Sequence, residues 1–582
     1  MGKKCSSTVS SGVGSAAKQK VRTGPQIIFD TLLDLGVDTL FGPSGAAVSP
    51  LFDRLADAPF RCIFPRHEQG GCHMADAYAR ASGKVGVILA THGPGICSLT
   101  TGLATAMMDS SPLVVLIGQD GVDLFERQAC HEANTMGITR AITKYTCAVK
   151  DITELERNLR EAFHVAATGR PGPVVVDLSA DLSVARTAGN GTIQMELPGY
   201  RLHTKGHARQ IAMAARAINK SNCPVLYVGG GVISAGATQE LRTLVEKAKL
   251  PVTMTLMGLG AFDQSRPESL DMLGVHGAAY ANYAVQACDL LVAVGARFDG
   301  RVTGKAASFA PNAKVVHIDI DPASISKNRQ GDIPVVGDAK WVLGELTRQV
   351  VFRDRAPWLA KIAEWKRAFP FCYDQSGSGI KPQFVIEEVH RQTKGRAIVT
   401  TGVGQHQMWA AQFYRFSRAR QFITSGGMGT TGFGLPAAIG AQLADPHAVV
   451  VDFDGEHNFI KTAMELSTAV EHQLPLKICI LNNQCMGWLR QRKGRPLREG
   501  QGKGQVPRPD IAKLAEAMGA IGLTVTEKGR VPQAIEQMLA ERRPCLLDFM
   551  VDCDENVWPM VLGDRSLDEM EGLDVLQQYR SP

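Results

Sequence analysis

From about residue 23 onward, the chain alternates helical stretches with short apolar runs rich in β-branched residues. This alternation is typical of parallel α/β domains, because each buried strand is followed by a helix that crosses back over the sheet. The pattern predicts an α/β fold with three Rossmann-like domains built on parallel sheets. The predicted buried strands are residues 85–90, 113–117, 174–178, 224–228, 290–294, 314–320, 397–400, 448–453, 476–481 and 545–551.

Polar and turn-rich stretches divide these strands into blocks. At 582 residues the chain is too long for one hydrophobic core, so three domains agree with its size. The polar stretch 186–205 is interpreted as a linker, and residues 352–382 as helical and connecting material. The predicted parts are a flexible N-terminal tail at 1–22, domains at 23–186, 200–350 and 375–555, and a C-terminal tail at 556–582.

The composition excludes several classes of protein. Hydrophobic residues make up 45% and charged residues 21%, as in ordinary globular proteins. The net charge of +6 is small for this length and does not favour nucleic-acid binding, and no apolar run is long enough to span a membrane. Thirteen cysteines show no CxxC pair or zinc-like spacing, which indicates reduced thiols in a cytoplasmic protein.

The first residues of the chain are basic and rich in Ser and Gly. They contain no acid before Asp30, and their basic residues are Lys3, Lys4, Lys18, Lys20 and Arg22. We expect a flexible cytosolic tail. Two alternatives stay open: an organellar transit peptide, and lipidation, because the start Met-Gly-Lys-Lys-Cys-Ser fits a myristoylation pattern with Cys5 as a second lipid site.

A metal-type motif follows two predicted strands of the last block. Asp454, Gly455 and Glu456 come after the run 448–453, and paired amides, Asn482 and Asn483, come after the next strand. Carboxylate and amide oxygens are ligands that Mg²⁺ prefers, and a diphosphate can complete the coordination shell. Gly455 removes a Cβ where a phosphate must approach the backbone closely. These residues predict a site for a magnesium-bound diphosphate.

A single glutamate, Glu68, lies between an apolar run at 60–64 and a helix-like stretch at 73–81. One interpretation is a solvated carboxylate at a helix start, where the helix dipole favours it. The other is a buried acid beside the aminopyrimidine ring of thiamine diphosphate, which needs such a proton donor to activate its thiazolium carbon. The pairing of this glutamate with the later Asp-Gly…Asn segment resembles thiamine-diphosphate enzymes.

Glycine-rich turns provide further candidate sites. Residues 91–95 and 425–430 follow or cap predicted strands, where backbone amides can contact a ligand, although either can be a plain turn. In the middle block, glycines, arginines and strand-end acids suit the phosphates and ribose of an adenine dinucleotide. Two interpretations stay open: the block binds a nucleotide, or it binds no ligand. The candidate nucleotide-binding residues are Gly229, Gly230, Gly231, Arg297, Asp299, Arg301, Asp319 and Asp338.

Longer segments resemble the catalytic subunit of acetohydroxyacid (acetolactate) synthase, a thiamine-diphosphate-dependent family, over residues 22–575. The resemblance is most specific in TGVGQHQMWAAQ at 401–412. The other matching segments are RHEQG at 66–70, GRPGPV at 169–174, MLGVHG at 272–277, GARFD at 295–299, RVTG at 301–304, FITSGG at 422–427 and GLPAAIG at 434–440.

The resemblance implies a carboligase that decarboxylates pyruvate and adds the two-carbon unit to a second 2-oxo acid. Its cofactors would be thiamine diphosphate, Mg²⁺ and a largely structural FAD. The first domain would bind the pyrimidine ring, the central domain the FAD, and the third the magnesium diphosphate. Each active site would be shared between the first domain of one chain and the third of another, in a homodimer or larger assembly that can carry a regulatory subunit.

The resemblance also assigns roles to single residues. Glu68 would be the pyrimidine acid, and Gly45, Ala46, His131 and Arg492 would complete the catalytic pocket. Glu456, Asn483 and the backbone of Cys485 would hold the metal. The residues expected to line thiamine diphosphate are Gly93, Pro94, Gln405, His406, Met428, Thr431 and Gly455.

Several of these positions depart from the family pattern. Glu456 replaces an Asp, Thr431 a Met, and Arg492 the acceptor-selecting Trp. The other departures are Ser44-Gly45-Ala46 for Pro-Gly-Gly, Cys130-His131 for Phe-Gln, His92 for a Ser, and Trp488 for a Met. They motivate two alternatives: a carboligase or decarboxylase with another donor or acceptor, and a catalytically silent paralogue that acts as a partner of an active subunit.

The segment from Arg490 to Arg508 is unlike the family. It contains seven basic residues and one acid, Glu499, for a net charge of +6, together with four glycines. One interpretation is a solvated basic loop. The other is an active-site lid reshaped for a more anionic acceptor.

Overall fold

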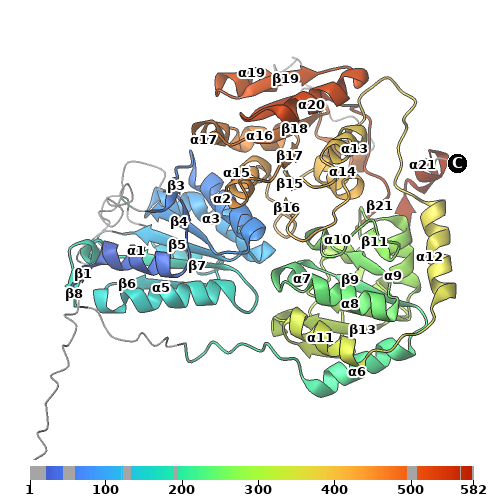
Figure 1. Cartoon of the computed structure of the whole chain (residues 1–582), viewed down its shortest axis with the longest axis horizontal. Helices are drawn as coiled ribbons and strands as arrows, with labels where there is room; N and C mark the ends of the chain where they lie inside the picture. The colour runs from blue at the N-terminus through green and yellow to red at the C-terminus, as the bar shows by residue number, and fades with distance from the viewer. Residues whose placement is uncertain are drawn as a thin grey trace, which may run out of the picture.

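The computed structural model describes residues 21–42, 59–119, 133–188, 197–493, 508–563 and 565–579, and the single residues 121, 123, 127, 131 and 195. Three six-stranded sheets dominate it, and every strand pair within them is parallel (Figure 1). The predicted α/β fold with three Rossmann-like domains is confirmed. The basic N-terminal residues 1–20 and the turn with Gly45 and Ala46 lie outside the described residues.

The first domain has the strand order β3-β2-β4-β5-β7-β6. Arg22, which the prediction placed in the tail, instead belongs to β1 (Arg22–Thr23), which pairs antiparallel with β8 (Arg186–Thr187). The strands are β2 (Thr39–Phe41), β3 (Arg61–Ile63), β4 (Gly86–Thr91), β5 (Leu113–Gly118), β6 (Tyr145–Val149) and β7 (Pro173–Leu178), and the helices are α1 (Gly24–Asp34), α2 (Glu68–Ser82), α3 (Pro94–Asp109), α4 (Thr135–Thr139) and α5 (Ile152–Ala167).

The central domain has the order β11-β10-β9-β12-β13-β14, which is the Rossmann strand order. Its strands are β9 (Pro224–Val228), β10 (Val252–Met254), β11 (Ser269–Met272), β12 (Leu290–Val294), β13 (Lys314–Asp319) and β14 (Ile333–Val336). Its helices are α6 (Ala208–Lys220), α7 (Gly230–Ser234), α8 (Thr238–Ala248), α9 (Ala279–Ala287), α10 (Gly300–Thr303), α11 (Ala339–Gln349) and α12 (Ala356–Ala368). The strand order reverses between β9 and β12, and ligands of such sheets bind at this reversal.

The third domain repeats the topology of the first, with the order β16-β15-β17-β18-β20-β19. Its strands are β15 (Ile398–Thr401), β16 (Phe422–Thr424), β17 (Val450–Asp454), β18 (Lys477–Asn482), β19 (Ile521–Val525) and β20 (Cys545–Met550). Its helices are α13 (Pro382–Gln392), α14 (Gln405–Phe413), α15 (Gly434–Ala444), α16 (Glu456–Thr462), α17 (Glu465–Glu471), α18 (Gly487–Lys493), α19 (Ile511–Ala517) and α20 (Val531–Ala540).

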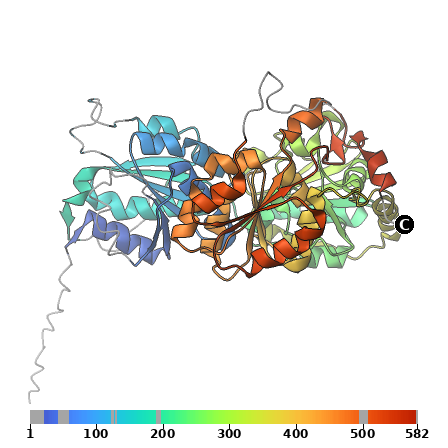
Figure 2. The same ribbon diagram turned by 90° about the horizontal axis from the view of Figure 1, so that it is seen from above.

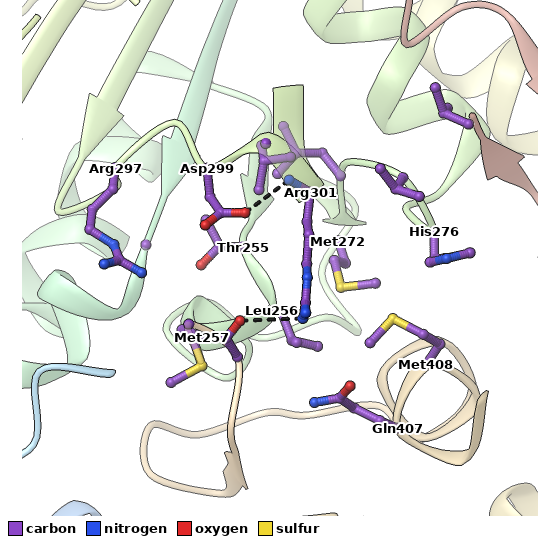
Figure 3. A pocket seen from close by; sticks show the side chains of 18 of the residues that line it. Thr255, Leu256, Met257, Met272, His276, Arg297, Asp299, Arg301, Gln407 and Met408 are labelled. Carbon is purple, nitrogen blue, oxygen red and sulfur yellow. Dashed lines mark hydrogen bonds between the residues drawn. The ribbon is translucent and has the colours of Figure 1, made fainter. Parts of the chain in front are cut away.

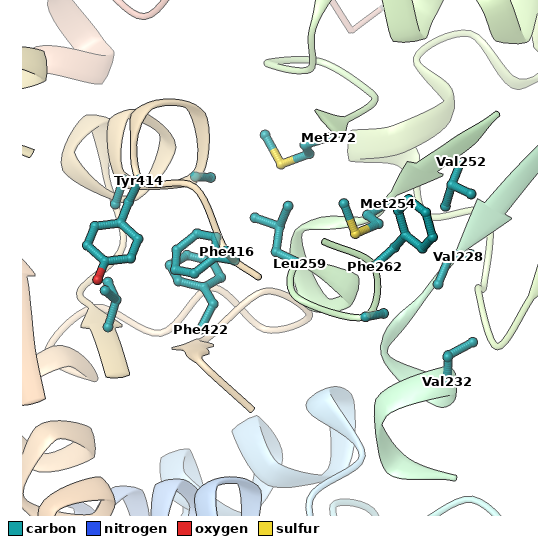
Figure 4. Close-up of a cluster of buried hydrophobic side chains, with 14 of the residues drawn as sticks. Val228, Val232, Val252, Met254, Leu259, Phe262, Met272, Tyr414, Phe416 and Phe422 are labelled. Atoms are coloured by element: carbon teal, nitrogen blue, oxygen red, sulfur yellow. The ribbon is translucent and has the colours of Figure 1, made fainter. Parts of the chain in front are cut away.

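The third domain contacts both of the others, which lie toward opposite ends of the long axis (Figures 1 and 2). Helix α2 of the first domain crosses α15 with backbone contact, because a Cβ at Gly440 would lie only 2.0 Å from the carbonyl oxygen of Met74. Toward the central domain, Met254, Leu259, Phe262 and Met272 share one buried hydrophobic cluster with Tyr414, Phe416 and Phe422 (Figure 4). The three sheets are therefore held in a fixed arrangement.

The C-terminal segment is not a free tail. Its strands β21 (Met560–Val561) and β22 (Met570–Glu571) pair antiparallel, and α21 (Leu573–Gln578) follows them. Val561, Leu567 and Met570 belong to the buried core of the central domain. None of the helices in the described ranges combines the length and apolar character that crossing a membrane requires.

Candidate functional site

The predicted metal ligands lie at the carboxyl edge of the third sheet. Strands β17 and β18 are neighbours, with Asp454 opposite Ile480, so Glu456 and Asn483 follow adjacent strand ends. Asn483 accepts a hydrogen bond at Oδ1 from the backbone N–H of Cys485 (3.3 Å) and donates from Nδ2 to Gln405 Oε1 (3.3 Å). The structure thus brings Asn483, Cys485 and the predicted cofactor residue Gln405 together through hydrogen bonds.

Glu456 is buried and faces a cation. Arg508 donates from Nη1 to Glu456 Oε1 at 3.1 Å, and His457 Nε2 lies 3.7 Å from the same oxygen. Arg508 is the last basic residue of the segment that begins at Arg490. The carboxylate expected to bind a metal therefore carries a positively charged partner from the same chain.

His406 packs against the predicted diphosphate glycine. A Cβ at Gly455 would lie 2.9 Å from His406 Nδ1, so this imidazole itself requires glycine at position 455. Burial lowers the pKa of His406 to about 3, which keeps the ring neutral, and its Nε2 lies 3.4 Å from Asp454 Oδ1. A neutral imidazole can donate one hydrogen bond and accept another without adding a charge to the site.

Two buried aspartates lie below this edge; the sequence placed Asp454 in the metal-type motif without giving it a role of its own, and Asp452 was not predicted as a site residue. A Cβ at Gly434 would lie 2.6 Å from Asp452 Oδ1 and 2.7 Å from Asp454 Oδ2, so the two carboxyl groups face one backbone position. Burial raises the pKa of both groups, and the charge of Asp452 adds to the shift at Asp454. Their strand-end positions in the sequence were the available signal.

Glu68 begins α2, and its neighbours anchor that helix start. The backbone N–H groups of Arg66 and His67 both donate to the carboxylate of Glu465 in the third domain, at 3.0 and 3.1 Å. Burial raises the pKa of Glu465. Glu68 itself is half-buried, and its carboxylate makes no hydrogen bond to any other residue that the structure describes. Glu68 therefore lies at a helix start, and its role as the acid beside a pyrimidine ring stays a prediction.

His131 lies against the predicted Gly-Pro turn of the first domain. Gly93 has φ 65°, and a Cβ there would lie 2.1 Å from the carbonyl oxygen of His131, so glycine is required both by conformation and by contact. Pro94 opens α3 directly afterwards, and the rings of His92 and His131 are 6.4 Å apart. The structure thus joins these two predicted segments at the carboxyl edge of the first sheet.

A polar network that the sequence did not reveal lies behind this turn. Gln119 donates from Nε2 to Asp177 Oδ2 (3.3 Å) and to the hydroxyl of Thr135 (3.1 Å). Burial raises the pKa of Asp177 to about 6, although the Gln119 hydrogen bond and the nearby His92 act in the opposite direction. Three separate segments form this network, and no local motif connects them.

Met428 and Thr431 belong to the turn after β16. The hydroxyl of Ser425 accepts hydrogen bonds from the backbone N–H groups of Gly429 and Thr430, at 3.1 and 3.0 Å, and fixes the turn. Lys461 donates from Nζ to Thr431 Oγ1 at 2.6 Å. Met428 is 49% exposed, which is high for a large apolar side chain.

Two adjoining cavities lie at the strand-order reversal of the central sheet, and Figure 3 shows the larger of them. One measures about 550 Å³ and the other about 440 Å³, and they share Gly230, Met257, Gly295 and Arg297 as walls. All eight candidate nucleotide residues line one or both of them: Gly229, Gly230, Arg297, Asp299 and Arg301 line the larger, and Gly230, Gly231, Arg297, Asp319 and Asp338 the smaller.

Local contacts within the protein explain some of the candidate nucleotide-binding residues. A Cβ at Gly229 would lie 2.1 Å from the carbonyl oxygen of Gly295, so this glycine lets the ends of β9 and β12 meet. Asp338 caps α11 by accepting from the N–H groups of Lys340 and Trp341. Burial raises the pKa of Asp319 to about 6.

The larger cavity continues into the third domain. Gln407, Met408, Trp488 and Arg492 line it from that side, and the ring of His276 lies 4.6 Å from that of Trp488. Figure 3 shows Gln407, Met408 and His276 around the space into which Arg301 extends. Arg492 therefore lies in the same cavity as part of the predicted nucleotide set.

Comparison with known proteins finds matches in all three domains. Three family models match: "Thiamine pyrophosphate enzyme, N-terminal TPP binding domain" over residues 22–138, "central domain" over 211–346, and "C-terminal TPP binding domain" over 402–549. The acetolactate synthase large subunit IlvB1 of Mycobacterium tuberculosis is 44% identical, covering 94% of this chain and 91% of that protein. The chain belongs to the acetolactate synthase family.

Further relatives agree with this placement. The mitochondrial acetolactate synthase catalytic subunit of Saccharomyces cerevisiae is 42% identical over 95% of this chain and 84% of its own. The chloroplastic acetolactate synthase 3 of Brassica napus is 42% identical over 94% and 86%. The resemblance inferred from the motifs is confirmed, and the chain is a thiamine-diphosphate-dependent enzyme of the acetolactate synthase type.

Proposed function

We propose that this enzyme decarboxylates pyruvate and adds the two-carbon unit to a second 2-oxo acid. The observation that carries the proposal is the assembly at the third-sheet edge, where Glu456, Asn483, Gln405 and His406 gather within one chain. The family supports this carboligase over the two alternatives, a carboligase or decarboxylase with another donor or acceptor and a catalytically silent paralogue.

The donors at this edge fit magnesium and a diphosphate. Glu456, the amide of Asn483 and the backbone carbonyl of Cys485 would hold Mg²⁺, and the pairing of Glu456 with Arg508 supports its capacity to balance a cation. Gln405, His406, Gly455, Met428 and Thr431 would contact thiamine diphosphate. When bound, this cofactor supplies the acyl-anion chemistry for carbon–carbon bond formation.

Glu68 would hold and donate a proton at the pyrimidine ring, with Gly93, Pro94 and His131 lining the same side. A second chain would complete the site, so we propose a homodimer or larger assembly with each site at the interface. Two observations support it: the carboxylate of Glu68 is half-buried, and large apolar side chains are 39–49% exposed beside the metal edge. These side chains are Met428, Ile460, Met464, Met486 and Leu489.

The two adjoining cavities fit an adenine dinucleotide, for which we propose FAD in a structural role. Their position at the β9/β12 reversal and the positive charges of Arg297 and Arg301 support a diphosphate ligand there. A flavin absorbance spectrum of the purified protein, and its release on denaturation, test this assignment.

We further propose a cytoplasmic location and association with a regulatory subunit. All eleven cysteines that the structure describes carry free thiols, which fits a reducing compartment. The printed names of the relatives, large subunit and catalytic subunit, support a second subunit. Cell fractionation and co-purification from native cells test these two points.

The reaction is tested with purified protein, thiamine diphosphate, Mg²⁺ and pyruvate. We expect CO₂ release together with a 2-hydroxy-2-acetyl acid, identified by mass spectrometry. Pyruvate that is not consumed under these conditions, while other 2-oxo acids are, would overturn pyruvate as the donor.

A further inference from the structure

A third cavity, of about 220 Å³, is bounded by the C-terminal helix α21 and shares no lining residue with the two cavities at the central sheet. Its other walls come from the chain around the start of α13, the end of α14 and the segment after β20. Cys372 Sγ donates to the carbonyl oxygen of Leu576 in α21 (3.1 Å), and a Cβ at Gly572, directly before that helix, would lie 2.4 Å from the Trp558 ring. The C-terminal helix is therefore a fixed wall of this cavity.

The charges that line the cavity favour a cation. Three carboxylates and one ammonium group line it: Asp374, Asp554, Glu555 and Lys381. The charge of Lys381 is satisfied within the protein, because Nζ donates to Glu555 Oε2 (2.6 Å) and to Asp552 Oδ2, outside the lining (2.8 Å). The lining thus carries two more negative than positive charges.

Two of these carboxylates have little neutralisation of their own. Asp374 forms no ion pair with any described residue, and hydrogen bonds from Ser376 lower its pKa, so it is ionised. Asp554 lies 3.2 Å from the guanidinium of Arg490, but its side chain is 86% exposed, which makes this ion pair weak. Both carboxylates are available to a positively charged ligand.

Aromatic rings supply much of the remaining lining. The four aromatic residues are Tyr373, Phe413, Trp558 and Tyr579. The rings of Tyr373 and Phe413 lie 5.6 Å apart at 84°, and the Tyr373 hydroxyl donates to Glu387 (2.6 Å), so this side chain is held in place. Aromatic faces attract organic cations, whereas metal ions prefer oxygen ligands, so rings together with carboxylates are typical of an organic ammonium site.

Two buried glutamines of the lining each have a side-chain oxygen without a hydrogen-bond partner among the described residues. Gln383 is 3% exposed and Gln412 is 7% exposed. Gln383 donates from Nε2 to Glu555 Oε1 (2.9 Å), and Gln412 donates to the carbonyl oxygens of His276 (3.0 Å) and Trp558 (3.1 Å). These acceptors fix which end of each amide is the oxygen. A buried acceptor without a donor is costly, so a ligand with N–H groups suits this cavity.

We propose that this cavity binds a small aliphatic primary ammonium ion. The carboxylates balance its charge, the aromatic rings pack against its ammonium and methylene groups, and the glutamine oxygens accept its N–H groups. The cavity contains none of the residues that the proposed function uses, so this inference does not depend on the carboligase reaction.

Calorimetric titration of the holoenzyme with butylammonium chloride at pH 7.5 tests the proposal. We expect saturable binding of one ion per chain with a Kd of about 1 mM or below. Two probes of similar size separate the contributions to binding: butan-1-ol lacks the charge, and tetramethylammonium lacks the N–H groups. Each should bind at least about tenfold more weakly.

Asp374→Asn tests the location of the site. It removes one lining charge and keeps the Oδ1 that accepts from Ser376, so we expect about three- to tenfold weaker binding of butylammonium. Asp263→Asn is the matched control, because Asp263 begins the same Asp-Gln-Ser sequence, accepts from the N–H and hydroxyl of Ser265 (2.9 and 2.7 Å), and lies outside the cavity lining. Its Kd should be that of the wild type.

Tyr579→Leu is a second, independent variant near the end of the chain. It replaces an aromatic wall with an aliphatic one, and we expect about 3- to 30-fold weaker binding. Absence of saturable butylammonium binding to the wild type would overturn the proposal, as would wild-type affinity in both Asp374→Asn and Tyr579→Leu. Binding of Ca²⁺ without binding of butylammonium would instead identify a metal site and would equally overturn it.

Discussion

The first and third domains share one strand order, yet the carboxyl edges of their sheets differ in how complete they are. At the third edge, Glu456 pairs with Arg508, and Asn483 is bonded to Gln405 and to the Cys485 backbone. At the first edge, Glu68 is half-buried and its carboxylate is bonded to no described residue.

The difference indicates that the two sheet edges would have different roles. Groups that hold a metal and a diphosphate must be positioned beforehand, because misplaced ligands lose affinity, and hydrogen bonds within one chain achieve this. A proton-transferring acid instead acts in the environment that its ligand and a covering surface create, and its own chain supplies only the position. In the proposed function, the third edge would thus be a preformed binding site, and the first would provide a reactive group.

The largest expected effect is at the carboxyl edge of the first sheet, where Glu68 lies. Glu68→Gln keeps the shape of the side chain and removes the exchangeable proton, so we expect CO₂ release from pyruvate to fall by about 10²- to 10⁴-fold. Because Glu68 makes no hydrogen bond to a described residue, the melting temperature should stay within about 2 °C of the wild type. Retained activity would show that Glu68 is only a helix-start carboxylate.

The contact that positions α2 should be sensitive to one methyl group. Gly440→Ala places a Cβ 2.0 Å from the Met74 carbonyl oxygen, so the helices must separate; we expect a loss of about 2–4 kcal/mol in the free energy of unfolding. Gly344→Ala in α11 is the control, since its Cβ meets nothing within 4 Å, and should be neutral or stabilising by about 0.5–1 kcal/mol. Equal effects in chemical denaturation would contradict this packing argument.

His406 should make the third edge sensitive to acid. Its folded pKa of about 3 lies below the ordinary value of 6.5, so the unfolded chain binds the extra proton between these values and stability falls as the pH is lowered through that window. His406→Gln removes this contribution. The stability difference between wild type and variant should therefore shrink by about 2 kcal/mol from pH 7.5 to pH 5, as measured by urea unfolding at each pH; a constant difference would contradict a buried neutral imidazole.

The smallest expected effect concerns the cation at Glu456. Arg508→Ala removes a partner that competes with a metal, and because the Arg508 side chain is 31% exposed the ion pair is worth only about 1 kcal/mol. We expect Mg²⁺ to bind about fivefold more tightly in the presence of thiamine diphosphate, by calorimetric titration. Weaker binding would mean that Arg508 contacts the diphosphate instead.

The sequence predicted the inner strands better than the outer ones. Strands β9 and β12 have the predicted bounds because their residues are buried on both faces and form continuous apolar runs. The edge strands β6 and β19 were missed, since exposed residues interrupt them, and β10 was missed because it has only three residues.

At the candidate site, too, some features could be predicted from the sequence and others could not. Glu456 and Asn483 could be predicted because each directly follows a strand, and adjacent parallel strands end at the same edge. The ion pair of Glu456 with Arg508, and the hydrogen bond of Gln405 with Gln491, join residues that are 52 and 86 positions apart. Such pairs arise only from the folded arrangement, and no periodicity or motif in the sequence records them.

The central claim is that each active site combines Glu68 of one chain with the metal edge of another. Mixing Glu68→Gln chains with Asn483→Ala chains, unfolding and refolding them together or co-expressing them, tests it directly. If sites are shared, random assembly places two intact halves together in one site in four, and about a quarter of the wild-type CO₂ release should return. Activity that stays at the level of the separate variants would contradict the account, because it would place both halves of the site in the same chain.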